Sequence, residues 1–487
     1  MRGQHIVRRD LSLRPRRSVA AAAVGVLCAF TIAAGFTVNR LLPGRLALWQ
    51  SPHISAGRLA GADQVLGPAT GAATPGAAAT PAGVARAIGA LVGSPALGPQ
   101  LGVLVTDLTT GRVLYARNPA AGFAPASTDK LATAIAALQV LGPSARFTTT
   151  VVAHPGLSSI ILVGGGDPTL AAGQPPASDY PEPATLAELA RQTATVLRTH
   201  GRRSVRLGYD VSLYTGPGLA PSWPNSYVST GNVSVITPLE ADQGRVTRTG
   251  APADTNASAG TRSADPAALA ATSFAGFLAA DGITVRGAPA QVTAPAGASP
   301  VASVQSPPLT EIIQWMLEQS NNVIAENLAR HVAIATGRPA SFTGAAAAVT
   351  AVLHGLGVNG AVSLFDGSGL SPADRISPAV LVKLIALAAS HPQLRSVLTG
   401  LPVEGFSGTL MRGGSVFGLG GQAGFGVVRA KTGNLSTVAT LAGTVYARNG
   451  QLLAFAVMAD QVSADSLGTA ATTMVGLAST LAGCGCR

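Results

Sequence analysis

Helical and strand-like patterns of apolar residues alternate along residues 84–487 and predict an α+β fold. Strand-like segments are clearest near the two ends of this region, and the last two are joined by Arg-Asn-Gly, a turn typical of hairpins. The predicted strands are 101–106, 112–117, 427–431, 438–447 and 451–459. We therefore expect a five-stranded antiparallel sheet, built from both ends of the region and flanked by helices.

The middle of the region has a different pattern. Residues 148–262 are rich in Pro, Ser and Thr and show no long helical pattern after His200. They are therefore predicted to form an inserted, mostly β accessory domain. Residues 84–147 and 263–487 are then the two parts of the main domain.

The N-terminal region is not predicted to be globular. Residues 1–17 form a basic tail, and residues 18–38 carry no charge over a length that can span a bilayer as a helix. The preceding arginines favour a cytoplasmic N-terminus, so a single-pass anchor would place the remaining chain outside the membrane. A cleaved signal sequence is the alternative. Residues 39–83 are rich in Pro, Ala and Gly and are predicted to be a flexible linker.

Composition narrows the possible functions. The net charge of +11 comes partly from the N-terminal arginines, and no lysine-rich patch with interleaved aromatic residues favours nucleic acid as a partner. Neither an H-E-x-x-H pattern nor a His/Cys cluster is present, so no metal and no other cofactor is expected. His331, His354 and His391 are interpreted as helix-face or surface residues. A bridge between Cys484 and Cys486 would be strained, which leaves free thiols or an intermolecular bond open.

An alanine-rich helix that starts near Ser127 and stops at Gly142-Pro143 carries the first candidate for chemistry. Ser127 and Lys130 share a face of its first turn because they are three residues apart. A desolvated lysine can be neutral and can take the proton of a hydroxyl group. Alone, this pattern is weak and favours an N-cap serine and a solvated lysine over a catalytic pair. However, only three of the 33 Lys and Arg residues are lysines, which favours a specific need for each one.

The other two lysines lie near the end of the chain. Lys383 belongs to an apolar helical run and is interpreted as a residue whose amine reaches solvent. Lys431 opens the segment Lys431-Thr432-Gly433 at the end of a predicted strand.

A further polar segment, Ser320-Asn321-Asn322, interrupts a helical run between Leu309 and Leu328. This interruption predicts a loop or a junction between two helices, where serine and asparagine commonly act as caps. In the functional interpretation, the hydroxyl of Ser320 transfers a proton, and the side-chain amide of Asn322 binds a peptide group of the substrate.

Together these segments resemble the motifs of the penicillin-binding serine acyl-transferases in order and approximate spacing. The resemblance spans about residues 84–483 and is most specific for the D-alanyl-D-alanine carboxypeptidase/endopeptidase family of low-molecular-mass (class C) penicillin-binding proteins. The segments typical of that family are VGGGDPTL at 163–170, DGSGLS at 366–371 and LPVEGFSGTL at 401–410. The resemblance implies a penicillin-binding/serine β-lactamase-like fold with an inserted accessory domain.

The resemblance also implies catalytic roles. Ser127 would attack the carbonyl between the two terminal D-alanines of a peptidoglycan stem peptide, with Lys130 as its base. Ser320, beside Lys130 and Lys431, would return the proton to the departing D-alanine. Water would then release the acyl-enzyme, whereas a β-lactam would acylate Ser127 and leave slowly.

The substrate-binding residues that the resemblance implies are Asn322, Thr432, Gly433 and Asn434. Asn322 would bind the stem peptide, and Thr432 with Lys431 would hold the terminal carboxylate. The backbone N–H groups of Ser127 and Asn434 would form the oxyanion hole. The family usually has threonine at position 434, and a backbone role is compatible with asparagine.

Two other functions stay open at this point. One is a serine β-lactamase or esterase with the same motifs, which the middle residue Asn321 and the lack of a Glu-x-x-Leu-Asn segment disfavour. The other is a catalytically inactive wall-binding protein. The principal expectation is a D-Ala-D-Ala carboxypeptidase on the extracytoplasmic side of the membrane, with endopeptidase activity left open.

Overall fold

The structure, a computed structural model, describes residues 78–487 except 154, 176–179, 247–260 and 413–415. The predicted basic tail, the predicted membrane anchor or signal sequence and nearly all of the predicted linker lie outside the described residues. Within the described part, no helix combines the length and the hydropathy that a bilayer crossing needs.

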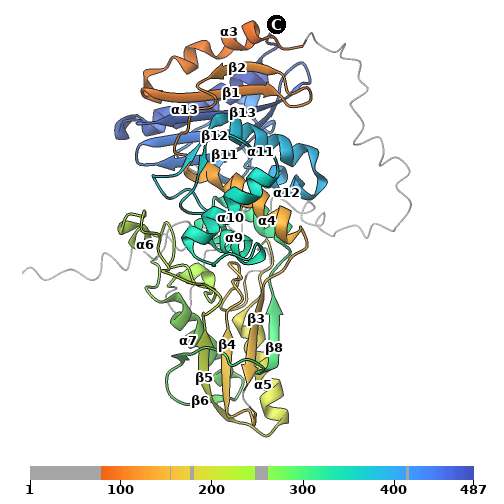
Figure 1. The fold of residues 1–487 in the computed structure, drawn as a ribbon, viewed down its shortest axis with the longest axis vertical. Coiled ribbons are helices and arrows are strands. Elements are labelled where there is room, and N and C mark those ends of the chain that lie inside the picture. The colour runs from red at the N-terminus through yellow and green to blue at the C-terminus, as the bar shows by residue number, and fades with distance from the viewer. Residues whose placement is uncertain (1–77, 154, 176–179, 247–260, 413–415) are drawn as a thin grey trace, which may run out of the picture. The chain divides into compact units, whose positions relative to one another are not determined.

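A five-stranded antiparallel sheet with the order β11-β12-β13-β1-β2 forms the centre of the main domain (Figure 1). Its strands are β1 (Gln100–Asp107), β2 (Val113–Arg117), β11 (Val428–Leu435), β12 (Val438–Tyr446) and β13 (Leu452–Asp460). The predicted sheet, made from both ends of the region, is therefore confirmed. β11 forms one edge of the sheet, and its outer side contacts elements outside the sheet, beginning with a bridge between Arg429 and Val403.

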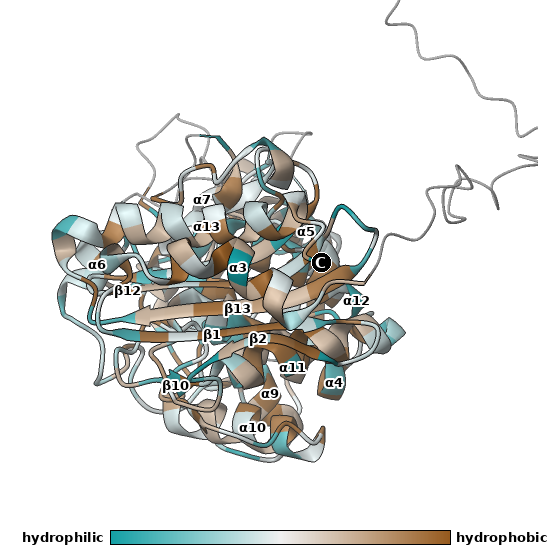
Figure 2. Cartoon of the chain, turned by 90° about the horizontal axis from the view of Figure 1, so that it is seen from above, coloured by the Kyte–Doolittle hydropathy of each residue, from teal (hydrophilic) through white to brown (hydrophobic). Residues whose placement is uncertain are grey.

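Both faces of this sheet are covered by helices because the side chains of its inner strands are apolar on both sides. Along β13, Phe455 and Val457 belong to the core with α3 (Pro81–Val92) and α13 (Leu467–Gly483), whereas Ala456 and Met458 belong to the core on the opposite side. Figure 2 shows β1 and β13 between these two helices and the helices α9, α10 and α11.

The helices of the opposite side include the elements that carry the candidate residues. α4 is buried along most of its length, as expected for a helix that is apolar all round. The helices of this side are α4 (Lys130–Leu141), α8 (Leu309–Gln319), α9 (Asn322–Ala335), α10 (Phe342–Gly355), α11 (Pro378–Ser390) and α12 (Arg395–Thr399). The short strands β9 (Val362–Ser363) and β10 (Arg375–Ile376) pair beside them.

A second sheet with its own apolar core follows the first part of the main domain. Its order is β6-β5-β4-β3-β8, with β7 paired to β5. The strands are β3 (Thr148–Ala153), β4 (Ser159–Val163), β5 (Ser204–Asp210), β6 (Thr284–Val285), β7 (Ala290–Gln291) and β8 (Ser299–Gln305). The helices α5 (Leu186–Thr199) and α7 (Pro266–Ala280) share this core.

This second sheet differs from the predicted insert at its C-terminal boundary and in its helix content. The insert was expected to end at residue 262, but the sheet and its helices continue through β8 at Gln305. The helical pattern of α7 was assigned to the main domain, although its apolar side chains pack against the second sheet. The layer also combines parallel and antiparallel pairing with two long helices, so it is less purely β than expected.

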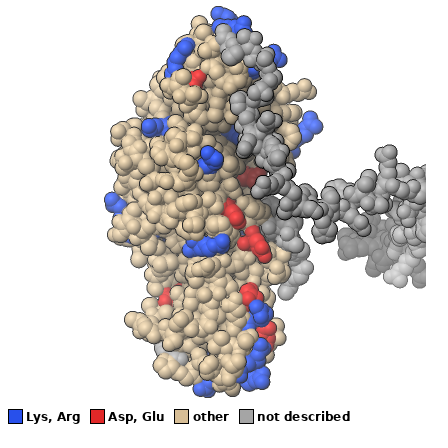
Figure 3. Space-filling model, turned by 90° about the vertical axis from the view of Figure 1, so that its right-hand side faces the viewer, with Lys and Arg blue, Asp and Glu red and all other residues tan. Residues whose placement is uncertain are grey.

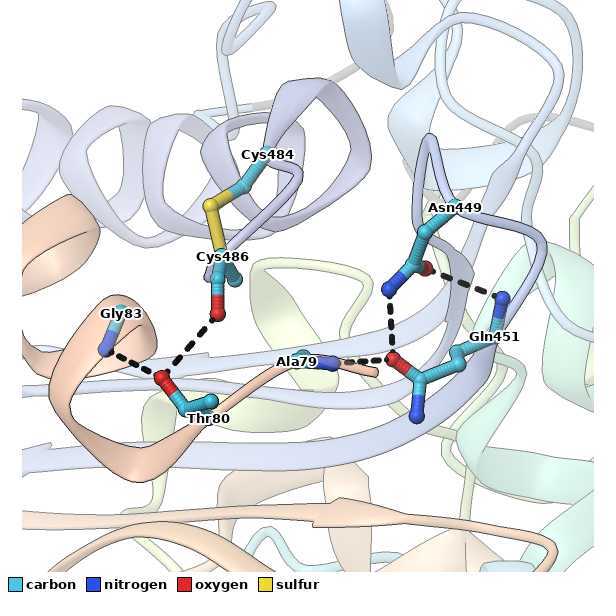
Figure 4. Close-up of a disulfide and its surroundings, with 7 residues drawn as sticks. All are labelled: Ala79, Thr80, Gly83, Asn449, Gln451, Cys484 and Cys486. Carbon is cyan, nitrogen blue, oxygen red and sulfur yellow. Dashed lines mark hydrogen bonds between the residues drawn. A yellow bond between two sulfur atoms is a disulfide. The ribbon is translucent and has the colours of Figure 1, made fainter. Parts of the chain in front are cut away.

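The C-terminus lies against the N-terminal end of α3 (Figure 4). Cys484 and Cys486 form an intrachain disulfide with a Cα–Cα distance of 5.0 Å, within the usual range for a bridge, so neither of the two states left open by the sequence applies. The carbonyl of Cys486 accepts hydrogen bonds from Thr80, whose side chain caps α3. α3 consequently begins at Pro81, inside the predicted linker.

Charged side chains are few and dispersed. On the face shown in Figure 3, lysine and arginine side chains are distributed from one end to the other, with a few acidic side chains among them. Lys383 is exposed on α11, and His354 and His391 are exposed, as predicted. His331 is different: it is buried on α9, where its ring stacks on Phe147 at 3.9 Å between centroids, and burial lowers its pKa to about 4.

Candidate active site

Ser127 occupies a tight turn immediately before α4. The turn is a short 3₁₀ helix, Ala126–Asp129, and Ala126 has a φ of 46°, which is costly for a residue with a Cβ atom. α4 then begins at Lys130, so the serine and the lysine are one turn apart, as predicted. The Ser127 hydroxyl is half-buried and accepts a hydrogen bond of 2.8 Å from Lys130 Nζ.

The amine of Lys130 is fully buried and donates to three oxygens. Besides Ser127 Oγ, it bonds Asn322 Oδ1 at 2.6 Å and the backbone carbonyl of Ser368 at 2.7 Å. Burial lowers the pKa of Lys130 to about 8, against the opposing effect of the acidic groups Asp366, Asp129 and Glu326. A far larger fraction of this amine is neutral at neutral pH than for a solvent-exposed lysine, as a proton acceptor requires.

Ser320 and Asn322 flank the junction between α8 and α9. Ser320 ends α8 with a φ of 57°, and the side chain of Asn321 caps α9 by accepting from the backbone N–H of Ile324. The predicted junction between two helices is thus confirmed, and Asn321 is the N-cap residue of α9. The bend presents Ser320 Oγ to one buried lysine and Asn322 Oδ1 to the other.

The edge strand β11 carries Lys431 and Thr432 to the same place. Lys431 Nζ is fully buried and donates to Ser320 Oγ at 2.9 Å and to the carbonyl of Thr432 at 2.8 Å. Burial first, and then the charge of Lys130, hold its pKa well below the usual value. The Thr432 hydroxyl pairs with that of Thr409 at 2.7 Å. The buried amines of Lys130 and Lys431 therefore contact the hydroxyl groups of Ser127 and Ser320, respectively, in one cluster.

Gly433 lies where β11 passes closest to the Ser127 turn. A Cβ atom at this position would overlap Thr440 Oγ1 and would lie 2.8 Å from the backbone nitrogen of Ser127 and 2.9 Å from the carbonyl of Pro125. Only glycine leaves room for this approach. Asn434 follows on β11 with an exposed side chain, so a contribution to the site would come from its backbone.

A group of buried carboxyls lies behind Lys130. Oxygen atoms of Asp129, Asp366 and Asp374 lie within 4.8 Å of one another. Burial and the charge of Asp366 raise the pKa of Asp129 well above its usual value and that of Asp374 to about 11. The raised pKa values favour the protonated forms of these two carboxyls, and this limits the negative charge next to the lysine.

Sequence reasoning missed the residues that support this cluster. Asp366 was noted only as the first residue of the segment DGSGLS, yet it is fully buried and accepts a hydrogen bond from the indole N–H of Trp223 at 2.7 Å. Asn322 Nδ2 donates to the carbonyl of Asn232 at 2.8 Å. The segment DGSGLS was a usable signal for Asp366, whereas nothing in the local pattern around Trp223 or Asn232 indicated such contacts.

The fold, together with two buried Ser–Lys contacts in one cluster, defines a serine acyl-transferase of the penicillin-binding type. Residues 84–259 and 248–481 match the D-Ala-D-Ala carboxypeptidase 3 (S13) family. The chain belongs to this family, and it is a serine-type D-Ala-D-Ala carboxypeptidase.

Similar proteins agree with this assignment. A carboxypeptidase DacB of Mycolicibacterium smegmatis is 36% identical over 412 residues, covering 83% of this chain and 85% of the relative. The crystal structure of penicillin-binding protein 4 from Haemophilus influenzae matches with a TM-score of 0.65 at 21% identity, over 80% of this chain and 98% of that one. A complex of that protein with a β-lactam matches with a TM-score of 0.59, also at 21% identity and with the same coverage. At this identity the two structures support the fold.

Proposed function

We propose that this enzyme removes the terminal D-alanine from peptidoglycan stem peptides through an acyl-enzyme on Ser127. The observation that carries the assignment is the pair of contacts from buried amines, Lys130 Nζ to Ser127 Oγ at 2.8 Å and Lys431 Nζ to Ser320 Oγ at 2.9 Å. Endopeptidase cleavage would use the same chemistry, with the amine of a cross-linked peptide as the leaving group. Membership of the family favours this reaction over a β-lactamase or esterase.

The proposed acylation step starts with a neutral Lys130. Its Nζ takes the proton of Ser127 Oγ while this oxygen attacks the carbonyl carbon of the bond to the last D-alanine. The backbone N–H groups of Ser127 and Asn434 stabilise the oxyanion. Ser320 then delivers its proton to the leaving nitrogen and recovers a proton from the ammonium form of Lys130, while Lys431 stabilises the transient negative charge on Ser320 Oγ. Lys130, neutral again, takes a proton from the water that attacks the ester, and this proton returns to Ser127 Oγ as the shortened peptide leaves.

Substrate binding is assigned to the remaining residues. Thr432 and Lys431 hold the terminal carboxylate, and the negative charge of that group favours the ammonium form of Lys431. Asn322 binds the peptide backbone of the stem, with Gly433 keeping β11 close to the nucleophile. A β-lactam would acylate Ser127 in the same way, and a β-lactam complex is known for the Haemophilus influenzae protein of the same fold.

We also propose that residues 18–38 anchor the enzyme in the membrane or direct its export. The uncharged length of this segment and the arginines that precede it support the proposal. The catalytic body would then act on the extracytoplasmic side, where its substrate is located.

The direct test is covalent labelling. Intact-mass measurement of the body after exposure to penicillin should show an increase by one penicillin, and peptide mapping should locate it on Ser127. An adduct elsewhere, or none, would contradict the assignment.

The acylation rate is expected to rise with pH. Because the pKa of Lys130 is lowered to about 8, its neutral fraction increases through that pH, and a base must be neutral to accept the proton. The second-order rate constant for penicillin, measured between about pH 6 and pH 9, should therefore show a limb with its midpoint near 8. A rate constant that stays flat over this range would exclude Lys130 as the base.

Lys431→Arg is expected to lower kcat/KM on a peptide that ends in D-Ala-D-Ala by about 100-fold, although the charge is kept. The larger planar guanidinium does not fit the fully buried site of the ammonium group, and it displaces the Ser320 contact. The matched control is Lys383→Arg, because Lys383 is the exposed lysine of α11. Equal activity of the two variants would contradict the role of Lys431.

A further inference from the structure

The position of the Lys130 amine depends on groups outside the motifs. Of its three acceptors, Ser127 Oγ is the reacting atom, so Asn322 Oδ1 and the carbonyl of Ser368 are the two that orient it. Both acceptors are connected to one short segment of the chain between Lys130 and Ser320. Asn322 is hydrogen-bonded to this segment directly, and Ser368 is connected to it through Asp366. This segment comprises residues 223–232 and includes α6 (Ser226–Ser229).

Trp223 reaches one of these acceptors, the carbonyl of Ser368, through Asp366. Both carboxylate oxygens of Asp366 accept hydrogen bonds from its own loop: Oδ1 from the N–H groups of Ser368 and Gly369 at 3.0 and 2.7 Å, and Oδ2 from that of Ser371 at 2.6 Å. The indole N–H of Trp223 also donates to Oδ2, at 2.7 Å. Asp366 thereby shapes the loop that presents the Ser368 carbonyl to Lys130.

The indole is itself held in place. Trp223 is 7% exposed, and its ring packs edge-on against Phe342 of α10 with 5.0 Å between ring centroids. Its backbone N–H donates to the carbonyl of Ala220. Because the ring is already ordered by its packing, it loses little conformational entropy when its N–H donates to Asp366.

The other end of the segment reaches the other acceptor, the side chain of Asn322. The carbonyl of Asn232 accepts from Nδ2 of Asn322 at 2.8 Å, which leaves Oδ1 of that amide turned to Lys130. The backbone N–H of Asn232 donates to the carbonyl of Tyr227, and the guanidinium of Arg262 donates to the carbonyl of Gly231. Gly231 and Asn232 are thus held by hydrogen bonds both within residues 223–232 and from Arg262 outside them.

We infer that residues 223–232 position the catalytic lysine: Trp223, acting through Asp366, and Asn232, acting through Asn322, together orient the amine of Lys130 toward Ser127. Trp223 is a positioning residue in this scheme, because it acts on Lys130 through Asp366. The inference rests on the proposed role of Lys130 as the base. It gives this part of the inserted segment a function in the chemistry.

The sign of the expected effect follows from the hydrogen bonds that Lys130 makes, because a change at Trp223 removes none of the charged groups around the amine. The groups that act on it are Asp129 from its own turn, Asp366 from the loop, Glu326 from α9 and Lys431 from β11. Hydrogen bonds to the ammonium form favour that form and raise the pKa of the amine. Loosening the Ser368 carbonyl therefore lowers the pKa of Lys130, while the misplaced amine becomes a poorer base.

Trp223→Phe removes the indole donor and keeps an aromatic ring. We expect the plateau of the acylation rate constant for penicillin at high pH to fall about 10- to 100-fold, and the limb to shift to lower pH. Trp315→Phe is the matched control: Trp315 is half-buried on α8, and the same change there should leave rate and limb unchanged. The number of penicillin molecules bound per protein molecule counts the active sites in each sample.

Three outcomes would overturn the inference. The first is a Trp223→Phe enzyme with the wild-type rate and limb. The second is an acylation rate that falls only in proportion to the number of active sites, while the pH midpoint of the rate constant does not shift. A purely structural role of Trp223 predicts that result. If the variant does not fold, a pH titration of the indole ¹H–¹⁵N resonance of Trp223 in the wild-type enzyme takes the place of the measurement on the variant. That resonance should titrate with the midpoint of the acylation limb, and a resonance that stays constant through the midpoint is the third outcome.

The failure of this inference is distinguishable from the failure of the proposed function. If Ser127→Ala still takes up penicillin, the residue assignment fails and the inference fails with it. If Ser127→Ala is unlabelled while Trp223→Phe behaves as the wild type, only the positioning role of residues 223–232 is lost.

Discussion

Ser127→Ala is expected to abolish penicillin labelling and to lower D-Ala-D-Ala carboxypeptidase activity by at least about 10⁴-fold, because the variant has no oxygen to form the acyl-enzyme. The other serine of the cluster does not replace it in the described structure: Ser320 Oγ accepts its hydrogen bond from Lys431, whereas Lys130, the proposed base, donates to Ser127. Intact mass after exposure to penicillin and steady-state rates on the peptide measure the two effects.

Stability should change little in the same variant. Ser127 is half-buried, and without its hydroxyl Lys130 keeps its bonds to Asn322 and Ser368. The loss of one such contact costs about 1 kcal/mol, which corresponds to a shift in Tm of a few degrees at most for a chain of this size. Ser390→Ala, at the exposed end of α11, is the control and should keep full activity. Residual labelling of Ser127→Ala would show that another residue is the nucleophile.

The central sheet and the three motifs could be predicted because their signals are local. The Arg-Asn-Gly turn defined the hairpin that became β12 and β13, and the three-residue spacing of Ser127 and Lys130 required only one helical turn. The polar interruption at Ser320 marked the junction of α8 and α9. Each of these inferences used a few neighbouring residues and general backbone preferences.

Other features depend on long-range packing that no local pattern encodes. The helical period of α7 identifies a helix, but it does not say which of two sheets the apolar side covers, and so the insert boundary at 262 was wrong. His331 has an ordinary helical position, and it is buried by residues far away in sequence: its ring stacks on Phe147, and its Nε2 lies 2.9 Å from the carbonyl oxygen of Gly166. The disulfide between Cys484 and Cys486 depends on the fold of the C-terminal turn against α3.

The close approach of β11 to the nucleophile leads to the second large prediction. Gly433→Ala is expected to lower the rate constant for penicillin acylation by about 100- to 1,000-fold, the usual cost of losing an oxyanion-hole donor. The new methyl group would press on the backbone nitrogen of Ser127 and the carbonyl of Pro125, neither of which can rotate away. The hydroxyl of Thr440, the third neighbour, is already bonded to Pro125 at 2.7 Å. β11 must therefore move, and the two proposed oxyanion donors separate.

The same substitution should cost about 1–3 kcal/mol of stability, as is usual for overpacking a tight site. Thermal unfolding measures that term separately, so a folded but slowly acylating enzyme is the expected result. Gly89→Ala on α3 is the matched control, because a Cβ atom there meets nothing within 4 Å. That variant should acylate at the wild-type rate and gain up to about 1 kcal/mol of helix propensity. If Gly433→Ala acylates as fast as Gly89→Ala, the approach of β11 to Ser127 is not what builds the oxyanion hole, and the assignment of the Asn434 backbone falls with it.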